Sequence, residues 1–402
     1  MLALVALVWA DYAAAVRPGL LEVRREHHPR LYLGADNPIE LIVTNRGPRV
    51  VEARLRDTPP ASFRPSRLLH GGPVTPDEPT AFRYTVRPSA RGRYVFGVVV
   101  LRWRTPLGLL WRQHTLPLQE DLAVYPNLVD IEKYEVLARR GLLHEMGLRA
   151  SRLRGAGTEF ESLREYQSDD DYRRINWKAT ARRQRPITTL YQTERSQRLV
   201  IMLDEGRMML PGSGELSRLD RAVNAALLLS YVALGRGDRV GLLAFADTVT
   251  SYLPPRAGRR QFFSILEQLY NATARPVESD YATAFARLRR DLRGRSLVLL
   301  FTAPVDPDVS RLLGRHLALT ARHHLPIYVA LQDAELRAVA SQVPDSSARL
   351  YRKLVASRVL EEQEVIFEEM TRSGVHVVDV DQEQMAAAAI NRYLELKERA
   401  LL

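Results

Sequence analysis

The chain has 402 residues, 46% of them hydrophobic and 26% charged, which is typical of a folded protein with about two or three domains. It contains no cysteine, which excludes disulfides and cysteine-ligated metal centres and is typical of a reducing compartment. The net charge of +11 suits phosphate, lipid headgroups or an acidic protein, although a GC-rich genome that encodes arginine in place of lysine gives the same excess. Because 47 acidic residues are interleaved with the basic ones, we expect no specific nucleic-acid site.

Residues 1–16 form an apolar segment that starts with MLALVALVWA and contains one acid, Asp11. A helix that crosses a membrane needs about 20 apolar residues, so we interpret this stretch as a partial membrane segment. No basic region precedes it, which argues against a secretory signal. Under the positive-inside rule, the arginines that follow place the main domains on the cytoplasmic side of the cell membrane: Arg17, Arg24, Arg25 and Arg30. The alternative is an amphipathic or buried N-terminal helix.

Residues 20–125 have the pattern of an antiparallel β-sandwich domain, with short alternating strands between Gly- and Pro-rich turns. Alternate apolar residues mark the buried face of one strand: Ile39, Leu41 and Val43. The run 91–103 predicts a continuous strand with four side chains on one face: Tyr94, Phe96, Val98 and Val100. Residues 58–79 contain many of the prolines and predict a long loop.

Residues 126–197 contain a linker helix and a charged segment. Apolar residues at helical spacing predict the helix within 126–150. In the stretch LREYQSDDDYRRINWKATARRQRP, a helix over 171–182 puts Trp177 on the same face as Arg173 and Ala181. We interpret this stretch as an ionic, partly buried clamp with Arg173 and Trp177 packed inward. An anion-binding site is the alternative.

Residues 198–402 have the pattern of an α/β domain with a parallel sheet covered on both faces. Near-continuous apolar runs predict its strands: 199–203, 239–245, 297–301, 326–331 and 375–379. Amphipathic stretches predict its helices: 216–236, 259–270, 281–292, 308–323, 347–372 and 381–400. Residues 248–254 predict an antiparallel edge strand.

The stretch RLVIMLDEGRMML ends the first of these strands at Asp204. In open α/β sheets, ligands bind beyond the carboxyl ends of the strands, so Asp204 has the position of a functional residue. It can hold a metal ion, or it can accept hydrogen bonds from loop amides and organise the loop. The exposed tip that follows is a candidate partner contact, because methionine suits adaptable interfaces: Arg207, Met208 and Met209.

The chain resembles the "domain of unknown function 58" (DUF58) family in the motif E-Y-x-x-x-D-x-x-R-x-I-N-W-K-A-x-A-R-R, which is followed by a strand that ends in aspartate. Ten residues make up this signature segment: Arg164, Glu165, Tyr166, Asp170, Arg173, Asn176, Trp177, Lys178, Arg182 and Arg183. The resemblance implies a membrane-anchored N-terminal part and a β-sandwich before a domain similar to von Willebrand factor A, which is Rossmann-like.

The resemblance also implies a metal site of the form D-x-S-x-S that has become degenerate here. Asp204 matches the first position, while Gly206 and Met208 replace the two serines. Ser279 keeps a hydroxyl in a later loop, and Ala303 stands where relatives commonly carry aspartate. Magnesium needs about six oxygen ligands, so one carboxylate and one hydroxyl predict no resident metal and no other cofactor. If a metal binds, Asp204 and Ser279 are its ligands, and four nearby acids have the chemistry to add a ligand: Glu205, Asp280, Asp306 and Asp308.

The resemblance implies a protein partner of the MoxR-type AAA+ ATPases and a membrane-associated role in the assembly or maturation of other proteins. The sequence contains no Ser-His-Asp or Cys-His pattern and no nucleophile elbow, so we expect a non-enzymatic adaptor. Two alternatives stay open. One is a divalent-metal-dependent ligand-binding module, and the other is an unassigned hydrolase or nuclease.

Overall fold

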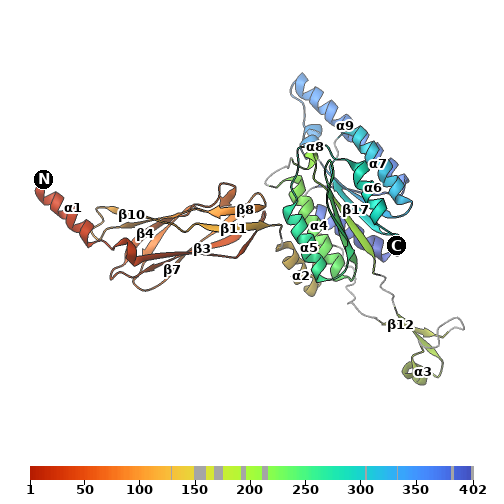
Figure 1. The fold of residues 1–402 in the computed structure, drawn as a ribbon, viewed down its shortest axis with the longest axis horizontal. Helices are drawn as coiled ribbons and strands as arrows, with labels where there is room; N and C mark the ends of the chain where they lie inside the picture. The colour runs from red at the N-terminus through yellow and green to blue at the C-terminus, as the bar shows by residue number, and fades with distance from the viewer. Residues whose placement is uncertain are drawn as a thin grey trace. The chain divides into compact units, whose positions relative to one another are not determined.

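The computed structural model describes residues 1–127, 129–148, 160–166, 175–191, 196–210, 216–303, 306–332, 334–381 and 384–399. The chain divides into two compact units (Figure 1). The first unit comprises Met1–Lys133 with Gly214–Asp220, and the second comprises Tyr134–Ser213 with Arg221–Leu402.

The first unit begins with the helix α1 (Leu2–Ala14), whose apolar side chains are mostly exposed. By length and composition, the stretch Leu2–Leu20 meets the requirement for a helix that crosses a membrane, with a mean hydropathy of 1.3. The same test is passed by signal sequences and by core helices of soluble proteins. Here only 17% of the stretch is buried, so it is not a core helix of this unit.

Eleven strands follow between Leu21 and Tyr125: β1 (Leu21–His27), β2 (Arg30–Tyr32), β3 (Asn37–Asn45), β4 (Val51–Arg56), β5 (Phe63–Pro65), β6 (Leu69–Val74), β7 (Thr80–Pro88), β8 (Gly92–Phe96), β9 (Val99–Arg104), β10 (Trp111–Leu116) and β11 (Glu120–Tyr125). Two antiparallel four-stranded sheets have the orders β1-β3-β7-β5 and β10-β9-β4-β6, and a third sheet has the order β2-β11-β8. Their inward side chains form one core, in which the alternation expected for Ile39, Leu41 and Val43 is confirmed.

Two expectations about these strands are wrong. Residues 58–79 are not one long loop, because they contain β5 and β6. The run 91–103 is not one strand, because the chain breaks at Gly97 between β8 and β9. At Gly97 a Cβ atom would lie 2.9 Å from the carbonyl oxygen of Thr58, so only glycine allows this close approach. The break shifts the buried face by one residue, from Phe96 to Val99.

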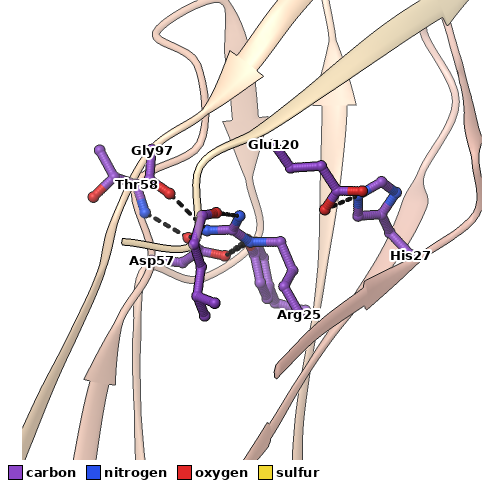
Figure 2. A network of polar contacts seen from close by, with 8 residues as sticks. Arg25, His27, Asp57, Thr58, Gly97 and Glu120 are labelled. Atoms are coloured by element: carbon purple, nitrogen blue, oxygen red, sulfur yellow. Dashed lines mark hydrogen bonds and ion pairs between the residues drawn. The ribbon is translucent and has the colours of Figure 1, made fainter. Parts of the chain in front are cut away.

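A buried ion pair lies inside the first unit (Figure 2). Arg25 Nε donates to Asp57 Oδ2 at 3.0 Å, and the two side chains are 2% and 1% exposed. Tyr84 OH and the Thr58 amide also donate to Asp57, at 2.6 and 2.7 Å. Arg25 in turn donates to the carbonyl oxygen of Gly97 at 3.0 Å. The pair thereby ties β1, the end of β4 and the chain break at Gly97 together.

The second unit contains a six-stranded sheet of order β16-β15-β14-β17-β18-β19, in which only β16 is antiparallel to its neighbour. Its strands are β14 (Arg198–Asp204), β15 (Arg239–Phe245), β16 (Val249–Arg256), β17 (Leu297–Thr302), β18 (Leu325–Leu331) and β19 (His376–Val380). All five predicted parallel strands and the predicted edge strand are confirmed. The four central strands, β14, β15, β17 and β18, are buried along almost their whole length, as expected for a sheet covered on both faces, whereas the outer strands β16 and β19 are only partly buried.

Helices cover both faces of this sheet (Figure 1). After β11 the chain contains the α-helices α2 (Val129–Arg140), α3 (Trp177–Arg183), α4 (Arg218–Gly235), α5 (Arg259–Asn271), α6 (Tyr281–Asp291), α7 (Pro307–Ala321), α8 (Ala334–Ser341), α9 (Ser347–Arg372) and α10 (Met385–Glu398), of which α3 contacts residues 187–191 and is not one of the helices that cover the sheet. Side chains of α6, α7 and α9 share one core cluster with β14, β15, β17 and β18, and α4 and α5 lie on the other face. The helix α8 was not predicted. The fold is therefore mixed α/β, with antiparallel sheets and an apolar N-terminal helix.

We predict that Asp57→Asn lowers the free energy of unfolding by about 3–5 kcal/mol, because the buried guanidinium of Arg25 loses its counter-charge. Urea unfolding of the full chain in detergent, followed through the buried Trp103, measures the change. The matched control is Asp36→Asn, which breaks an exposed ion pair with Arg87 and should cost less than about 1 kcal/mol. Equal effects of the two variants would contradict the prediction.

Candidate functional site: the closed rim around Asp204

Asp204 ends β14 at the carboxyl edge of the six-stranded sheet. Its strand is paired in parallel with β15 on one side and with β17 on the other. The chain runs from β14 to β15 and only later returns to β17, so the topology reverses direction at β14. Ligands of open α/β sheets bind at such a reversal, so this rim is the candidate functional site.

The carboxylate of Asp204 is fully buried and accepts four hydrogen bonds. Oδ1 accepts from the Gly206 amide at 2.8 Å and from Ser279 Oγ at 2.5 Å. Oδ2 accepts from Thr302 Oγ1 at 2.5 Å and from Tyr281 OH at 3.1 Å. A carboxylate has about four acceptor positions, so these donors use the whole capacity of Asp204.

Tyr281 and Thr302 are functional neighbours that the sequence did not indicate. Tyr281 starts α6, and Thr302 ends β17. Their hydroxyl oxygens lie 3.0 Å apart. Burial, and then the negative charge of Asp204, raise the pKa of Tyr281 well above its usual range, so its hydroxyl stays protonated and donates. The register of β17 against β14, which places Thr302 beside Asp204, was the only signal that could have identified Thr302.

Gly206 is the residue that allows this arrangement. A Cβ atom at position 206 would lie 2.0 Å from Ser279 Oγ, and 3.1 Å from both Asp204 Oδ1 and the carbonyl oxygen of Val277. The Ser279 hydroxyl therefore occupies the space that a side chain at 206 would take. Glycine at position 206 and the contact between Ser279 and Asp204 are therefore one coupled feature.

The other two positions that the resemblance assigns to a metal site carry no oxygen in their side chains. Ala303 follows β17 and is buried, and Met208 is half-buried in the short turn Arg207–Met209. In the part of the chain that the structure describes, no group of three or more His, Cys, Asp or Glu residues could hold a metal ion.

The four acids considered as additional ligands each have a structural partner: Glu205, Asp280, Asp306 and Asp308. Glu205 is buried and accepts from Thr250 Oγ1 at 2.6 Å. Asp280 is the N-cap of α6, and the hydrogen bonds that it accepts from the side chain and amide of Thr283 lower its pKa. These contacts hold the acids in their own loops.

The expected contact tip at residues 207–209 is only partly exposed. Arg207 is exposed and forms an ion pair with Glu278 at 2.5 Å. Met209 is fully buried, so its assignment to an exposed surface is wrong. The reason is the 3₁₀ turn that follows Gly206, which has three residues per turn and brings Met209 back over the buried position 206.

The signature segment is described for residues 160–166 and 175–191. Strand β12 (Phe160–Glu165), which contains Arg164, pairs antiparallel with β13 (Ile187–Tyr191), and Tyr166 N donates to the carbonyl oxygen of Pro186 at 2.8 Å. Glu165 forms an exposed ion pair with Arg185 at 3.0 Å. The helix α3 contains Lys178, Arg182 and Arg183. The side chains of Lys178 and Arg182 are exposed. Asp170 and Arg173 lie outside the described residues.

The prediction that Trp177 packs inward is wrong, because its side chain is 72% exposed. The predicted helix 171–182 put it on one face with Arg173. The observed helix α3 begins at Trp177 itself. Asn176 is its N-cap, and the side-chain oxygen of Asn176 accepts a hydrogen bond from the Ala179 amide at 3.1 Å. The predicted helix 171–182 is therefore not observed with those bounds, and the spacing argument for Trp177 does not apply.

The fold and the closed rim define a multidomain α/β protein in which the sheet-edge aspartate has a structural role. Within this class, residues 162–342 match the model of the family described as "Protein of unknown function DUF58". The resemblance carried by the signature motif is thus confirmed for this region.

Curated relatives are similar to part of the chain. Uncharacterized proteins of Mycobacterium bovis and Mycobacterium tuberculosis are each 29% identical over 171 residues, which are 42% of this chain and 53% of theirs. The chain thus spans about half the length of the curated relatives it matches.

Two solved structures resemble about a quarter of the chain. The CARDB domain of a Pyrococcus furiosus protein, solved in complex with di-metal ions, is 15% identical and covers 26% of this chain and 86% of its own, with a TM-score of 0.18. A FixG-related protein from Vibrio parahaemolyticus is 11% identical and covers 26% and 96%, with a TM-score of 0.19. At these scores neither likeness carries an argument about fold or function.

We predict that Gly206→Ser lowers the free energy of unfolding by about 1–3 kcal/mol, because the new side chain overlaps the Ser279 hydroxyl. Chemical denaturation of the full chain measures the loss. In the double variant Gly206→Ser/Ser279→Ala the overlapping atom is gone, so the loss should be smaller than the sum of the two single changes. Strict additivity would show that the two positions are not coupled.

Proposed function

We propose that this chain is a membrane-associated, non-enzymatic interaction protein that works with an AAA+ ATPase of the MoxR type in the assembly or maturation of other proteins. In this proposal the second unit is a von Willebrand A-like domain whose metal site has been closed. The DUF58 region and the position of Asp204 at the end of β14 support this assignment.

The observation that carries the proposal is an apolar surface on α8, α9 and the segment between them. Val343 is 88% exposed, Tyr351 70% and Leu354 60%. Along α9, Leu350, Tyr351, Leu354 and Val355 recur at helical spacing and form one exposed face. Exposed apolar patches of this kind mark protein interaction sites.

A shallow hollow lies within this surface and has a volume of about 390 Å³. Its lining is mostly apolar, with one acid and one arginine at its edge: Glu335, Leu336, Val339, Tyr351, Arg352, Val355 and Ala356. A hollow that an aromatic side chain partly fills is typical of the centre of a protein interface. We therefore assign the ATPase contact to this surface.

The chemistry at the sheet rim supports an adaptor more than an enzyme. A general base or metal ligand needs free lone pairs, and the four donors around Asp204 use those of its carboxylate. The donor set of one saturated carboxylate also does not suit magnesium, which needs about six oxygen ligands. We accordingly propose that the protein uses neither a metal nor another cofactor.

We predict that Tyr351→Ser/Leu354→Ser lowers the recovery of the AAA+ ATPase at least tenfold, because both side chains leave the proposed contact. A tagged full chain is isolated from native membranes, and the MoxR-type ATPase is identified and quantified by mass spectrometry. The matched control is Val365→Ser, which removes an exposed apolar side chain (57% exposed) from the same helix outside the hollow. If no AAA+ ATPase accompanies the unaltered chain, the proposed partner is wrong.

We predict that Asp204→Ala destabilises the chain by about 2–4 kcal/mol, because the buried hydroxyls of Tyr281 and Thr302 and the half-buried hydroxyl of Ser279 lose their acceptor. Asp280→Ala, which removes only a helix cap, should cost about 1 kcal/mol. In calorimetry with Mg²⁺ or Mn²⁺, neither the unaltered chain nor Asp204→Ala should give heat of binding. Heat that disappears with Asp204→Ala would favour the metal-dependent module instead.

A further inference from the structure

Asp11 is a buried acid in an otherwise exposed apolar helix. Its side chain is 1% exposed, while the neighbouring Trp9 and Tyr12 are 71% and 48% exposed. A carboxylate in an apolar helix is costly unless other groups satisfy it. The partners of Asp11 therefore show which part of the first unit lies against α1.

These partners all lie in the loop between β9 and β10. Thr105 Oγ1 donates to Asp11 at 2.5 Å, and the amides of Leu107 and Leu109 donate at 2.7 and 3.2 Å. Asp11 precedes the end of α1 by three residues, so at about 1.5 Å per residue the loop is held roughly 4–5 Å along the helix from its end.

The end of α1 is also fixed to the sheet below it. Trp103 Nε1 donates to the carbonyl oxygen of Val16 at 3.1 Å. The guanidinium of Arg112 lies 4.5 Å from the centre of the Tyr12 ring. The helix end and the β9–β10 loop thus form one rigid tip of the first unit.

The tip exposes apolar side chains next to basic ones. Leu107 is 61% exposed, Leu109 47% and Val50 56%. Arg49, Val50, Arg104 and Leu107 line a hollow of about 430 Å³, together with one acid, Glu52. Arg17 and Arg49 are exposed, and Arg112 is half-buried. Exposed apolar side chains with arginines beside them suit the boundary between lipid chains and anionic headgroups.

We propose that the loop Thr105–Leu110 and the turn around Arg49 and Val50 insert into the headgroup layer of a bilayer that contains anionic lipid. This inference rests on the membrane association included in the proposed function. Trp9 and Tyr12 are the residue types that lie at the membrane boundary, and Asp11 fixes the loop at their level along α1. Leu107 and Leu109 then contact lipid chains, and Arg49 and Arg104 contact lipid phosphate.

The chain has no cysteine, so single-cysteine variants carry one fluorescent label at a known position. The full chain is labelled with nitrobenzoxadiazole at Leu107→Cys, or at Leu109→Cys as a second site, and is reconstituted in phosphatidylcholine vesicles with or without phosphatidylglycerol. The control site is Val95→Cys, 56% exposed on β8, a strand at the end of this unit away from α1 (Figure 1).

We expect the labels at 107 and 109 to shift to shorter emission wavelength and to be quenched by lipids that carry a nitroxide near the headgroup, at least threefold more than the label at 95. Phosphatidylglycerol should increase this quenching. Arg49→Gln should reduce it at least twofold, whereas Arg56→Gln, which alters an exposed arginine at the other end of β4, should not.

Each other outcome overturns a defined part of the proposal. If the chain floats with vesicles but the labels at 107 and 109 are quenched no more than the label at 95, the inserted tip is wrong and membrane association stands. If the labels are shielded from water but nitroxide lipids do not quench them, a protein surface covers the tip instead. If the chain does not float with vesicles at all, the proposed membrane association itself fails.

Discussion

A carboxylate that is buried away from water must have its acceptor positions filled, and this constraint organises both units of the chain. Four of the described aspartates that are at most 1% exposed meet it: Asp11, Asp57, Asp204 and Asp238. Asp57 uses Arg25, and Asp238 uses Lys397 together with Tyr393 OH, at 2.8 and 2.5 Å. For Asp11 and Asp204 the donors in the described residues are hydroxyls and backbone amides. In every case most donors come from segments far away in the sequence, so satisfying the carboxylate and forming the tertiary structure are the same event.

The two ways of filling a carboxylate have different consequences for function. A neutral donor set such as that of Asp204 surrounds the carboxylate with hydroxyl and amide groups that donate to its oxygens, so on the proposed function these oxygens do not bind a metal. Opening the site for a metal would require Ser279, Thr302 and Tyr281 to lose their acceptor, and each unpaired buried hydroxyl costs about 1–3 kcal/mol. The hydrogen bonds between Asp204 and these hydroxyls therefore stabilise the rim at the end of β14 in the form that leaves no room for a metal ion. On the proposed function, recognition then depends on exposed side chains elsewhere.

Sequence patterns predicted the elements of this fold better than its contacts. Continuous apolar runs such as Leu199–Leu203 predict buried strands, because few other structures bury every residue of a short run. The donors to Asp204 were not predictable in the same way, since the position of Thr302 depends on the register between β14 and β17. Trp177 was misplaced because its helix begins later than its apolar spacing suggested. The strand break at Gly97 could not be predicted from the local sequence. Its cause is the nearby carbonyl oxygen of Thr58, which lies in the connection between β4 and β5.

The large exposed apolar side chains gather at particular places in each unit. In the first unit they concentrate on α1 and on the tip that Asp11 holds beside it, where arginine is interleaved with leucine and valine. In the second unit a group of them lies on the first half of α9, with Val343 in the segment between α8 and α9: Leu350, Tyr351, Leu354 and Val355. The second half of α9 packs into the core through Ile366 and Met370. A helix that is buried at one end and apolar but exposed at the other keeps a firm position while it presents a contact surface. On the proposed function, one unit thus supplies the lipid contact and the other the protein contact, and neither contact requires the closed rim at Asp204 to react.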